Sequence, residues 1–211
     1  MNNLFEVGVD EVGRGCLFGR VYCAAVILPD NFDQYLEKNL VLKDSKKISK
    51  NKREKLRKII ENHAIDYSVA YSEHYDIDRD NILQCTLNTM HKALDKLNTK
   101  FNLILVDGNH FNEYYDKDNN LINHRCIIGG DNINKCISAA SILAKTYRDE
   151  YITNLANENE DLKKYNIHNN MGYGTSAHIN GIKKYGLING HRLTFGICKS
   201  ISLFNNKNKI I

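Results

Sequence analysis

With 211 residues, of which 42% are hydrophobic and 26% charged, the chain has the balance of an ordinary globular protein and the length of one domain. A formal charge of +4 permits a polyanionic partner without requiring one. Six cysteines without a Cys-x-x-Cys pair argue against a zinc ribbon or a thioredoxin-type motif, and no apolar run approaches the ~20 residues that cross a bilayer. The start lacks a basic stretch followed by an apolar run, so no secretory signal is predicted and we expect a cytoplasmic protein with reduced cysteines. A monomer is a separate expectation.

Apolar runs of strand length come early in the chain. Strands are predicted at residues 4–10, 21–28, 65–71 and 103–106. The first ends at Asp10 and Glu11, and the last ends at Asp107. A glycine-punctuated turn, 13–15, separates the first two strands and predicts a hairpin-like pair.

Helical spacing of apolar residues dominates the rest. Helices are predicted at residues 49–61, 81–97, 137–151 and 175–185, with Ser49 as an N-cap. Early strands and later helices favour an α/β or α+β domain with a mixed central sheet. Because there is one proline and no Pro-rich or Gly/Ser-rich linker, we expect a single domain over 1–205, including a helical segment at about 155–200, followed by a flexible tail at 206–211.

Acidic side chains stand where strands and turns end. They are Asp10, Glu11, Asp107 and Asp131, the last after a Gly-Gly pair ahead of a predicted helix. Carboxylates at strand ends converge on the crevice where α/β sheets bind ligands. Such a cluster would repel itself, so a divalent cation with oxygen ligands, Mg²⁺ or Mn²⁺, is its natural complement. Two such ions could activate a water and stabilise the leaving oxygen of a phosphodiester.

A structural interpretation of these acids stays open. Strand-end carboxylates are commonly just solvated, and Asp131 could serve as a turn or capping residue. Neighbouring residues of a regular strand face opposite ways, so Asp10 and Glu11 share a site only if the strand breaks there, as the following glycines allow. A dinucleotide loop is rejected because the glycine spacing is wrong and the next segment reads as a strand.

Several blocks, in order and spacing, resemble the ribonuclease HII family from about residue 7 to 195. They are GVDEVGRG at 8–15, LKDSKKIS at 42–49, NILQ at 81–84, VDGN at 106–109, GD at 130–131, SAASILAK at 138–145 with Arg148 and Asp149, GYGT at 172–175, and His178, His191 and Arg192. The resemblance implies a ribonuclease H-like fold with a mixed central sheet and a helical C-terminal part.

By this resemblance the chain is a metal-dependent endonuclease. It would hydrolyse the RNA strand of RNA–DNA hybrids and incise duplex DNA 5′ of embedded ribonucleotides, as in ribonucleotide excision repair, leaving 3′-OH and 5′-phosphate ends. Asp10, Glu11, Asp107 and Asp131 would bind two Mn²⁺ or Mg²⁺ ions. One ion would activate water, and the other would support the departing 3′ oxygen.

The same resemblance implies the substrate contacts. Gly13, Arg14 and Gly15 would sense the ribose 2′-OH through backbone groups, and Tyr173 would stack on the sugar beside the scissile position. Phosphates would meet Lys46, Lys47, Lys145 and Arg192. On spacing alone these cations are more often solvated surface charges, and Asp149, four residues past Lys145, is an alternative ion-pair partner on a helix.

Departures from the family are few. Cys16 and Arg20 stand where the family usually has proline, which predicts a looser loop after Gly15, and Met171 stands where a lysine is usual. The sister type, ribonuclease HIII, usually carries an extra N-terminal domain, whereas this chain begins almost at the first catalytic strand. A non-catalytic hybrid-binding module would have lost the acids, which are present.

Overall fold

The structure is a computed structural model that describes residues 5–207, which form two compact units. Unit 1 comprises the chain up to Val12, Tyr22–Tyr71 and Thr86–Tyr147, and unit 2 comprises Gly13–Val21, Ser72–Cys85 and the chain from Arg148 onward. The expected single domain over 1–205 stays a prediction. Within the described range, no helix has the length and apolar character needed to cross a membrane.

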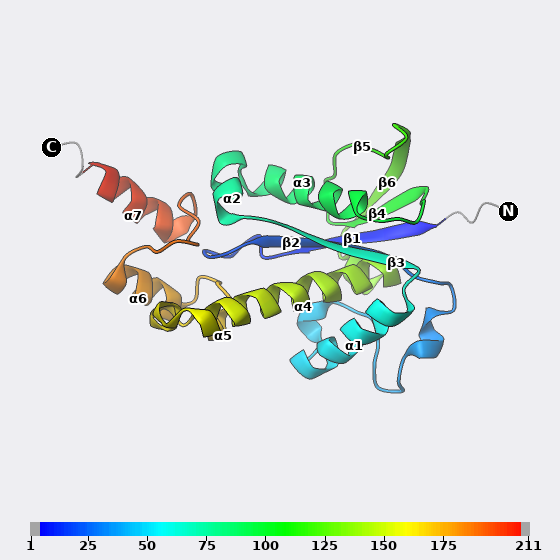
Figure 1. Ribbon diagram of the computed structural model, residues 1–211, viewed down its shortest axis with the longest axis horizontal. Helices are drawn as coiled ribbons and strands as arrows, with labels where there is room; N and C mark the ends of the chain where they lie inside the picture. Colours follow the sequence, from blue (N-terminus) through cyan, green and yellow to red (C-terminus); the bar gives the residue numbers. More distant parts are fainter. Residues whose placement is uncertain (1–4, 208–211) are drawn as a thin grey trace. The chain divides into compact units, whose positions relative to one another are not determined.

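Unit 1 is built on a six-stranded mixed sheet with the order β3-β2-β1-β4-β6-β5 (Figure 1). The strands are β1 (Glu6–Val12), β2 (Val21–Ile27), β3 (Asp66–Ser72), β4 (Leu103–Asp107), β5 (Tyr114–Tyr115) and β6 (Leu121–Ile127). Strand β1 pairs antiparallel with β2 and parallel with β4, and β4 pairs parallel with β6. The mixed central sheet of an α/β fold is therefore confirmed.

The helices are divided between the two units. They are α1 (Lys50–His63), α2 (His74–Asp80), α3 (Ile82–Asp95), α4 (Lys135–Glu158), α5 (Ile167–Asn170), α6 (Ser176–Tyr185) and α7 (Gly196–Lys207). Within unit 1, α3 packs apolar side chains such as Leu87 and Met90 against Val9 and Val106 of the central strands. Helix α4 approaches β1 closely at Gly8, where an added Cβ would lie 2.1 Å from the backbone of Cys136. Figure 1 shows α1 and α4 together on the face of the sheet opposite α3.

Each predicted strand and helix is present, most with ends shifted by one to three residues and α4 extending on to Glu158, but three expectations need correction. Strand β1 does not break at Asp10 and Glu11, because both keep antiparallel partners on β2. Ser49 occupies the N-cap position of α1 without a capping side-chain hydrogen bond. Helix α7 runs to Lys207, so residues 206 and 207 of the expected tail are helical, and 208–211 lie outside the described residues.

Several elements had no clear signal in the sequence. Strand β6 alternates only between exposed and half-buried positions and carries His124 and Arg125, so its apolar pattern is weak. Helix α2 has the sequence HYDIDRD, with Ile77 as its one buried residue, and is held by a capping box between Glu73 and Asp76.

Candidate functional site

All four acids singled out by the sequence lie in unit 1. Asp10 and Glu11 belong to β1, and Asp107 is the last residue of β4. The parallel register pairs Val9 with Val106, so Asp10 and Asp107 follow on neighbouring strands. Asp131 belongs to the short 3-10 helix η3 (Gly130–Asn132), which follows β6.

Backbone N–H groups hold two of these carboxylates. Asp10 Oδ1 accepts a hydrogen bond from the N–H of Glu11 at 2.6 Å. Asp107 Oδ1 accepts from the N–H of Gly130 at 2.8 Å, which ties η3 to the end of β4 and sets Asp131 beside it. The carboxylates of Asp10 and Asp107 are therefore held in place by the backbone of β1 and by the turn at Gly130.

The electrostatics of the cluster are repulsive. Asp10 is 4% exposed, and burial raises its pKa well above the usual value; the negative charges of Glu11 and Asp107 raise it further, against the effect of a hydrogen bond with Ser141. Burial also raises the pKa of Asp131, with Asp107 and Asp44 adding to the shift. Two buried carboxyls are thus held in an environment that disfavours their negative charge.

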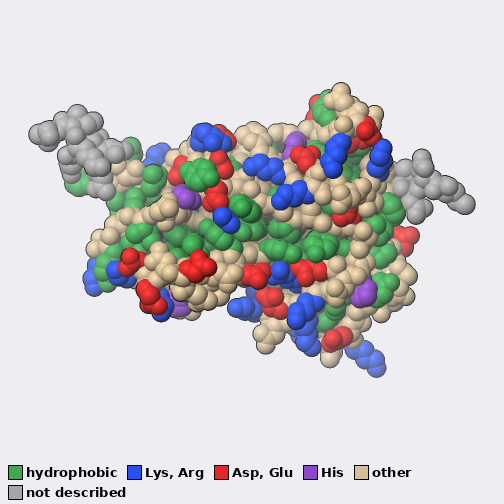
Figure 2. Space-filling view, viewed as in Figure 1, with side chains coloured by type: hydrophobic (Ala, Val, Ile, Leu, Met, Phe, Trp, Pro, Cys, Tyr) green, Lys and Arg blue, Asp and Glu red, His purple; other side chains and the backbone are tan. Residues whose placement is uncertain are grey.

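The Asp-Ser-Lys-Lys turn stands next to these acids in unit 1. It forms the 3-10 helix η2 (Ser45–Lys47), capped by Asp44, whose side chain accepts from the Lys46 N–H at 2.9 Å. Lys47 Nζ donates to Asn132 Oδ1 at 3.0 Å, beside Asp131. Both lysines are exposed, and Figure 2 shows further Lys and Arg side chains over the adjoining α1, whose sequence begins KNKREKLRK.

Ser141 joins the turn to Asp10. Its hydroxyl lies 3.0 Å from that of Ser45, both side chains are buried, and Ser141 also hydrogen bonds to Asp10. Lys145 lies four residues further along α4 and is half-buried, so it shares a helix face with Ser141. Sequence reasoning placed the two serines inside motifs but assigned them no role.

The donor chemistry of this cluster suits a hard divalent cation. Carboxylate oxygens are the ligands that Mg²⁺ and Mn²⁺ prefer, and a cation would relieve the repulsion that raises the pKa of Asp10. Across the described residues, 5–207, no set of three or more His, Cys, Asp or Glu side chains is already arranged to hold a metal ion. The negative charge of Asp107 raises the pKa of both Asp10 and Asp131, although these side chains do not enclose a common point.

The glycine turn lies in unit 2 and contains two different kinds of glycine. Gly13 has a φ of +94°, and an added Cβ would lie 2.3 Å from Nε of Arg148, so the fold itself requires glycine there. An added Cβ at Gly15 would meet nothing within 4 Å, and both Arg14 and Gly15 are exposed. The absence of a side chain at Gly15 is therefore not explained by packing.

Two fully buried arginines hold this turn. Arg148 donates to the carbonyl oxygens of Phe18, Arg20 and Met171, at 3.2, 3.1 and 2.8 Å. Arg192 donates to those of Arg14 and Gly19, at 3.0 and 2.9 Å.

The expectation that Arg192 meets phosphates does not fit this arrangement. Its side chain is 0% exposed and its guanidinium is turned toward backbone carbonyls, so it supports the turn from inside. Arg148, which sequence reasoning left without a role, does the same. A buried arginine gives little signal in a sequence because charged residues are mostly exposed.

Tyr173 stands beside the turn in unit 2. Its backbone forms an isolated antiparallel bridge with Cys16, and its side chain is 36% exposed, near the guanidinium of Arg148, whose central carbon lies 5.8 Å from the ring centroid. Burial raises the pKa of the phenol to about 12, so the hydroxyl is protonated at neutral pH. The ring thus keeps a partly exposed surface on a fixed backbone.

The loop after Gly15 is not loose, contrary to what the residues at positions 16 and 20 suggested. Cys16 is buried in the bridge to Tyr173, and the N–H of Leu17 donates to Gly172 at 2.9 Å. Arg20 pairs with Glu73 at 2.7 Å. Met171 contributes its carbonyl oxygen to Arg148 and packs into the apolar core of unit 2.

Comparison with known proteins gives one consistent result. The model of the ribonuclease HII family matches residues 7–198. Ribonuclease HII of Bacteroides thetaiotaomicron is 43% identical over 195 residues, covering 92% of this chain and 91% of the relative. Ribonuclease HII of Christiangramia forsetii is 46% identical over 188 residues, covering 89% of this chain and 88% of the relative.

Solved structures share the fold. Ribonuclease H2 from Pyrococcus horikoshii OT3 superposes with a TM-score of 0.76 at 23% identity, covering 97% of this chain and 100% of that one. The Bst-RNase HIII structure in complex with Mn²⁺ gives a TM-score of 0.66 at 17% identity, covering 98% of this chain and 71% of that one. The HIII chain thus has a large part with no counterpart here, whereas the H2 chain is matched along its length.

Proposed function

The chain belongs to the ribonuclease HII family of metal-dependent endoribonucleases, and from that premise we propose that it hydrolyses the RNA strand of RNA–DNA hybrids and incises duplex DNA 5′ of embedded ribonucleotides. The products would carry 3′-OH and 5′-phosphate ends. The observation that supports this proposal most strongly is the cluster of mutually repelling carboxylates at the ends of β1 and β4, with Asp131 beside them.

Asp10, Glu11, Asp107 and Asp131 would hold two Mn²⁺ or Mg²⁺ ions. Although β1 stays paired through Glu11, the charge of Glu11 still raises the pKa of Asp10, so the unbroken strand does not isolate these two carboxyls from each other. When bound, such ions supply Lewis acidity that activates the attacking water and stabilises the leaving 3′ oxygen. The chain's own contribution is to fix the oxygen donors: backbone N–H groups hold Asp10 and Asp107, and Ser141 holds Asp10 from α4. Ligands fixed in this way need little reorganisation when the ions arrive.

Substrate selection would fall to unit 2. The exposed backbone at Arg14 and Gly15 has room for a close approach, which a ribose 2′-OH needs if it is to be read by peptide groups. Gly13 would act by giving the turn its shape. Tyr173 would stack on the sugar through its exposed ring surface.

Phosphate contacts would come from Lys46, Lys47 and Lys145. The first two are exposed on η2 beside Asn132, and the third lies on the Ser141 face of α4. Such contacts set position and affinity but carry no information on the sugar. The expected monomer and cytoplasmic location stay predictions.

A nicking assay tests the proposal. A duplex DNA with one ribonucleotide is incubated with the protein and Mn²⁺ or Mg²⁺, and the ends of the products are mapped; an all-DNA duplex and a chelator serve as controls. We expect one cut, 5′ of the ribonucleotide, that requires the metal. Equal cutting of the all-DNA duplex would mark a general nuclease, and binding without cutting would mark a hybrid-binding module.

A further inference from the structure

Two histidines that the proposed reaction does not use meet inside unit 2. His178 of α6 and His191 are 0% and 1% exposed, and their Nε2 atoms lie 3.1 Å apart. The rings of Phe18 and Tyr165 pack edge-on against His191, with centroid distances of 5.3 and 5.2 Å. Two imidazoles in direct contact cannot both be charged, because two buried positive charges would repel strongly, and burial lowers the pKa of each, so both rings are neutral at pH 7.

The hydrogen-bond partners decide which nitrogen of each ring carries its proton. His178 Nδ1 lies 2.9 Å from the carbonyl oxygen of Tyr173, which can only accept, so His178 is protonated at Nδ1. Its Nε2 is then bare and must accept from Nε2–H of His191. That leaves Nδ1 of His191 bare, and the N–H of Ile188 donates to it at 3.0 Å.

The result is a chain of three hydrogen bonds, here called the relay, in which every donor points the same way. Protons point from Ile188 through His191 and His178 to the carbonyl of Tyr173. The carbonyl of Ile188 lies 3.2 Å from His191 Nδ1, but a proton on that nitrogen of a neutral ring would leave two bare Nε2 atoms facing each other across 3.1 Å. Every ring nitrogen is used once, so neither histidine can change tautomer without breaking the chain.

Both ends of the relay lie on backbone that holds the glycine turn. Tyr173 bridges Cys16, and His191 bridges Phe18. The N–H of Thr175 also donates to the Tyr173 carbonyl at 2.8 Å, so two donors fix this one peptide group. The relay therefore ties the two segments that flank residues 16–18 to each other.

We propose that His178 and His191 are positioning residues for Tyr173, which they hold against the glycine turn through this neutral, one-directional relay. The inference rests on the proposed role of Tyr173 at the ribonucleotide. Neither imidazole touches the substrate in this scheme, and both act through the Tyr173 peptide. Replacing either histidine should therefore slow cleavage at a ribonucleotide when Tyr173 is present, and should have little effect when Tyr173 is absent.

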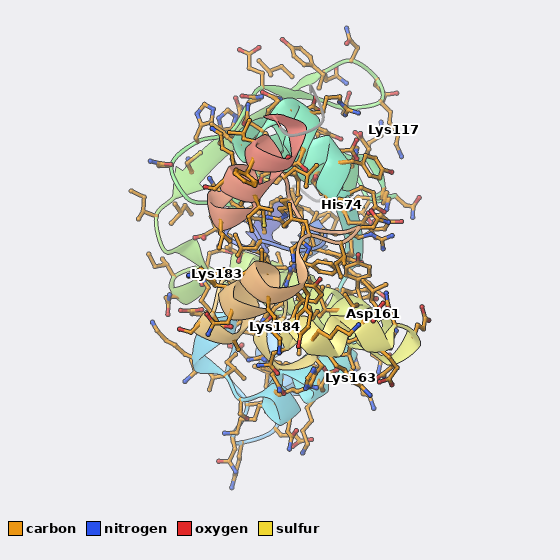
Figure 3. All side chains as sticks on the ribbon, turned by 90° about the vertical axis from the view of Figure 1, so that its left-hand side faces the viewer. His74, Lys117, Asp161, Lys163, Lys183 and Lys184 are labelled. Atoms are coloured by element: carbon orange, nitrogen blue, oxygen red, sulfur yellow. The ribbon has the colours of Figure 1, made fainter. Side chains whose placement is uncertain are left out.

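The surroundings keep the relay neutral. Burial lowers the pKa of both imidazoles, that of His191 to about 4, where His178 and His74 of α2 add to the shift. The other charged groups on α6, Lys183 and Lys184 in its last turn, are exposed (Figure 3). The pair contacts the rings of Phe18 and Tyr165 and the backbone of Tyr173 and Ile188, and no carboxylate among the described residues contributes to either shift.

A double-mutant cycle tests the proposal. His191→Leu removes the donor to His178 and Tyr173→Ala removes the side chain being positioned; each is made alone and together, and single-turnover cleavage of the single-ribonucleotide duplex is measured. We expect His191→Leu to slow cleavage about tenfold or more, since misplacement by ~1 Å can cost ~100-fold. In the Tyr173→Ala background the same change should cost less than about twofold.

Matched variants separate positioning from folding. His191→Gln can keep an N–H donor near the Nε2 position and should restore most of the cleavage, whereas His168→Leu, at an exposed histidine of the same unit, should change nothing. In the wild type, ¹⁵N–¹H spectra of the imidazoles at pH 7 should show His178 protonated at Nδ1 and His191 at Nε2.

Each outcome decides something. If Tyr173→Ala leaves cleavage intact, the proposed function of Tyr173 fails, and the positioning role fails with it. If Tyr173→Ala is damaging but the two changes act additively, only the positioning role is wrong. The opposite tautomers, or a charged ring at pH 7, would overturn the relay whatever the kinetics show.

Discussion

The two units bury charge of opposite sign and treat it in opposite ways. In unit 1, Asp10 and Asp131 are buried among other carboxylates, and their pKa values are raised. In unit 2, Arg148 and Arg192 are fully buried but are turned toward backbone carbonyls, which accept from them. The acids repel one another and are electrostatically incomplete without a cation. Each arginine has carbonyl acceptors, although burial lowers the pKa of Arg192 to about 10 and its Nη2 has no hydrogen-bond partner among the described residues. A buried charge surrounded by like charges points to function, whereas a buried charge that donates to backbone carbonyls points to structure.

The largest effect is expected from Asp107→Asn. It removes a ligand charge without changing size, so cleavage should fall by more than about a hundredfold, beyond the ~10–100-fold typical of residues that only support ligands. Thermal unfolding in the presence of a chelator should show no loss of stability, since one source of repulsion on Asp10 and Asp131 disappears. Near-normal turnover at saturating metal would remove Asp107 from the set of ligands.

The glycine turn offers a contrast within unit 2. Gly13→Ala should destabilise the protein by about 1–3 kcal/mol, because it forces a residue with a Cβ into a left-handed backbone conformation against Arg148. Gly15→Ala should leave thermal unfolding unchanged and reduce cleavage, because its Cβ would stand in open space where the 2′-OH is expected. Lost stability in Gly15→Ala together with lost cleavage alone in Gly13→Ala would contradict this assignment of a structural role to Gly13 and a substrate role to Gly15.

The acids of unit 1 could be predicted from the sequence, whereas the buried arginines of unit 2 could not. The acids were found because strand ends at Asp10 and Asp107 follow short apolar runs that are easily recognised. The break in β1 was wrong because the pairing of Glu11 with Cys23 on β2 outweighs the local effect of the nearby glycines. The burial of Arg192 was missed because its acceptors, the carbonyls of Arg14 and Gly19, are supplied by a segment far away in the chain.

Acid should act on the two regions with opposite sign. The pKa of Asp10 is raised in the fold, so lowering the pH toward that raised value relieves repulsion and adds stability. The pKa of His191 is lowered to about 4 from its ordinary 6.5, so stability is lost as the pH falls through that window, by up to about 3 kcal/mol. Chemical denaturation between pH 7 and pH 4 should show a shallower loss for His191→Gln and a steeper one for Asp10→Asn than for the wild type.

The smallest effect concerns the exposed lysines. Lys46→Ala should weaken binding to every duplex about equally and reduce the slope of log affinity against log salt by about 1, as expected for one lost phosphate contact. Fluorescence anisotropy over a salt series measures this slope. The pair Lys100 and Asp118 is exposed in unit 1, so Lys100→Ala serves as a control whose slope should not change. An unchanged slope for Lys46→Ala would show that Lys46 does not contact a phosphate.

One equilibrium measurement tests the division of labour most directly. Asp107→Asn binds without cutting in this account, so its affinity is measured for a single-ribonucleotide duplex and for its 2′-deoxy counterpart, and then again after adding Gly15→Ala. We predict that Asp107→Asn prefers the ribonucleotide and that the added change brings the ratio of the two affinities close to one, with little effect on the deoxy duplex. A preference that survives Gly15→Ala unchanged would contradict the claim that the turn in unit 2 selects what the acids in unit 1 cut.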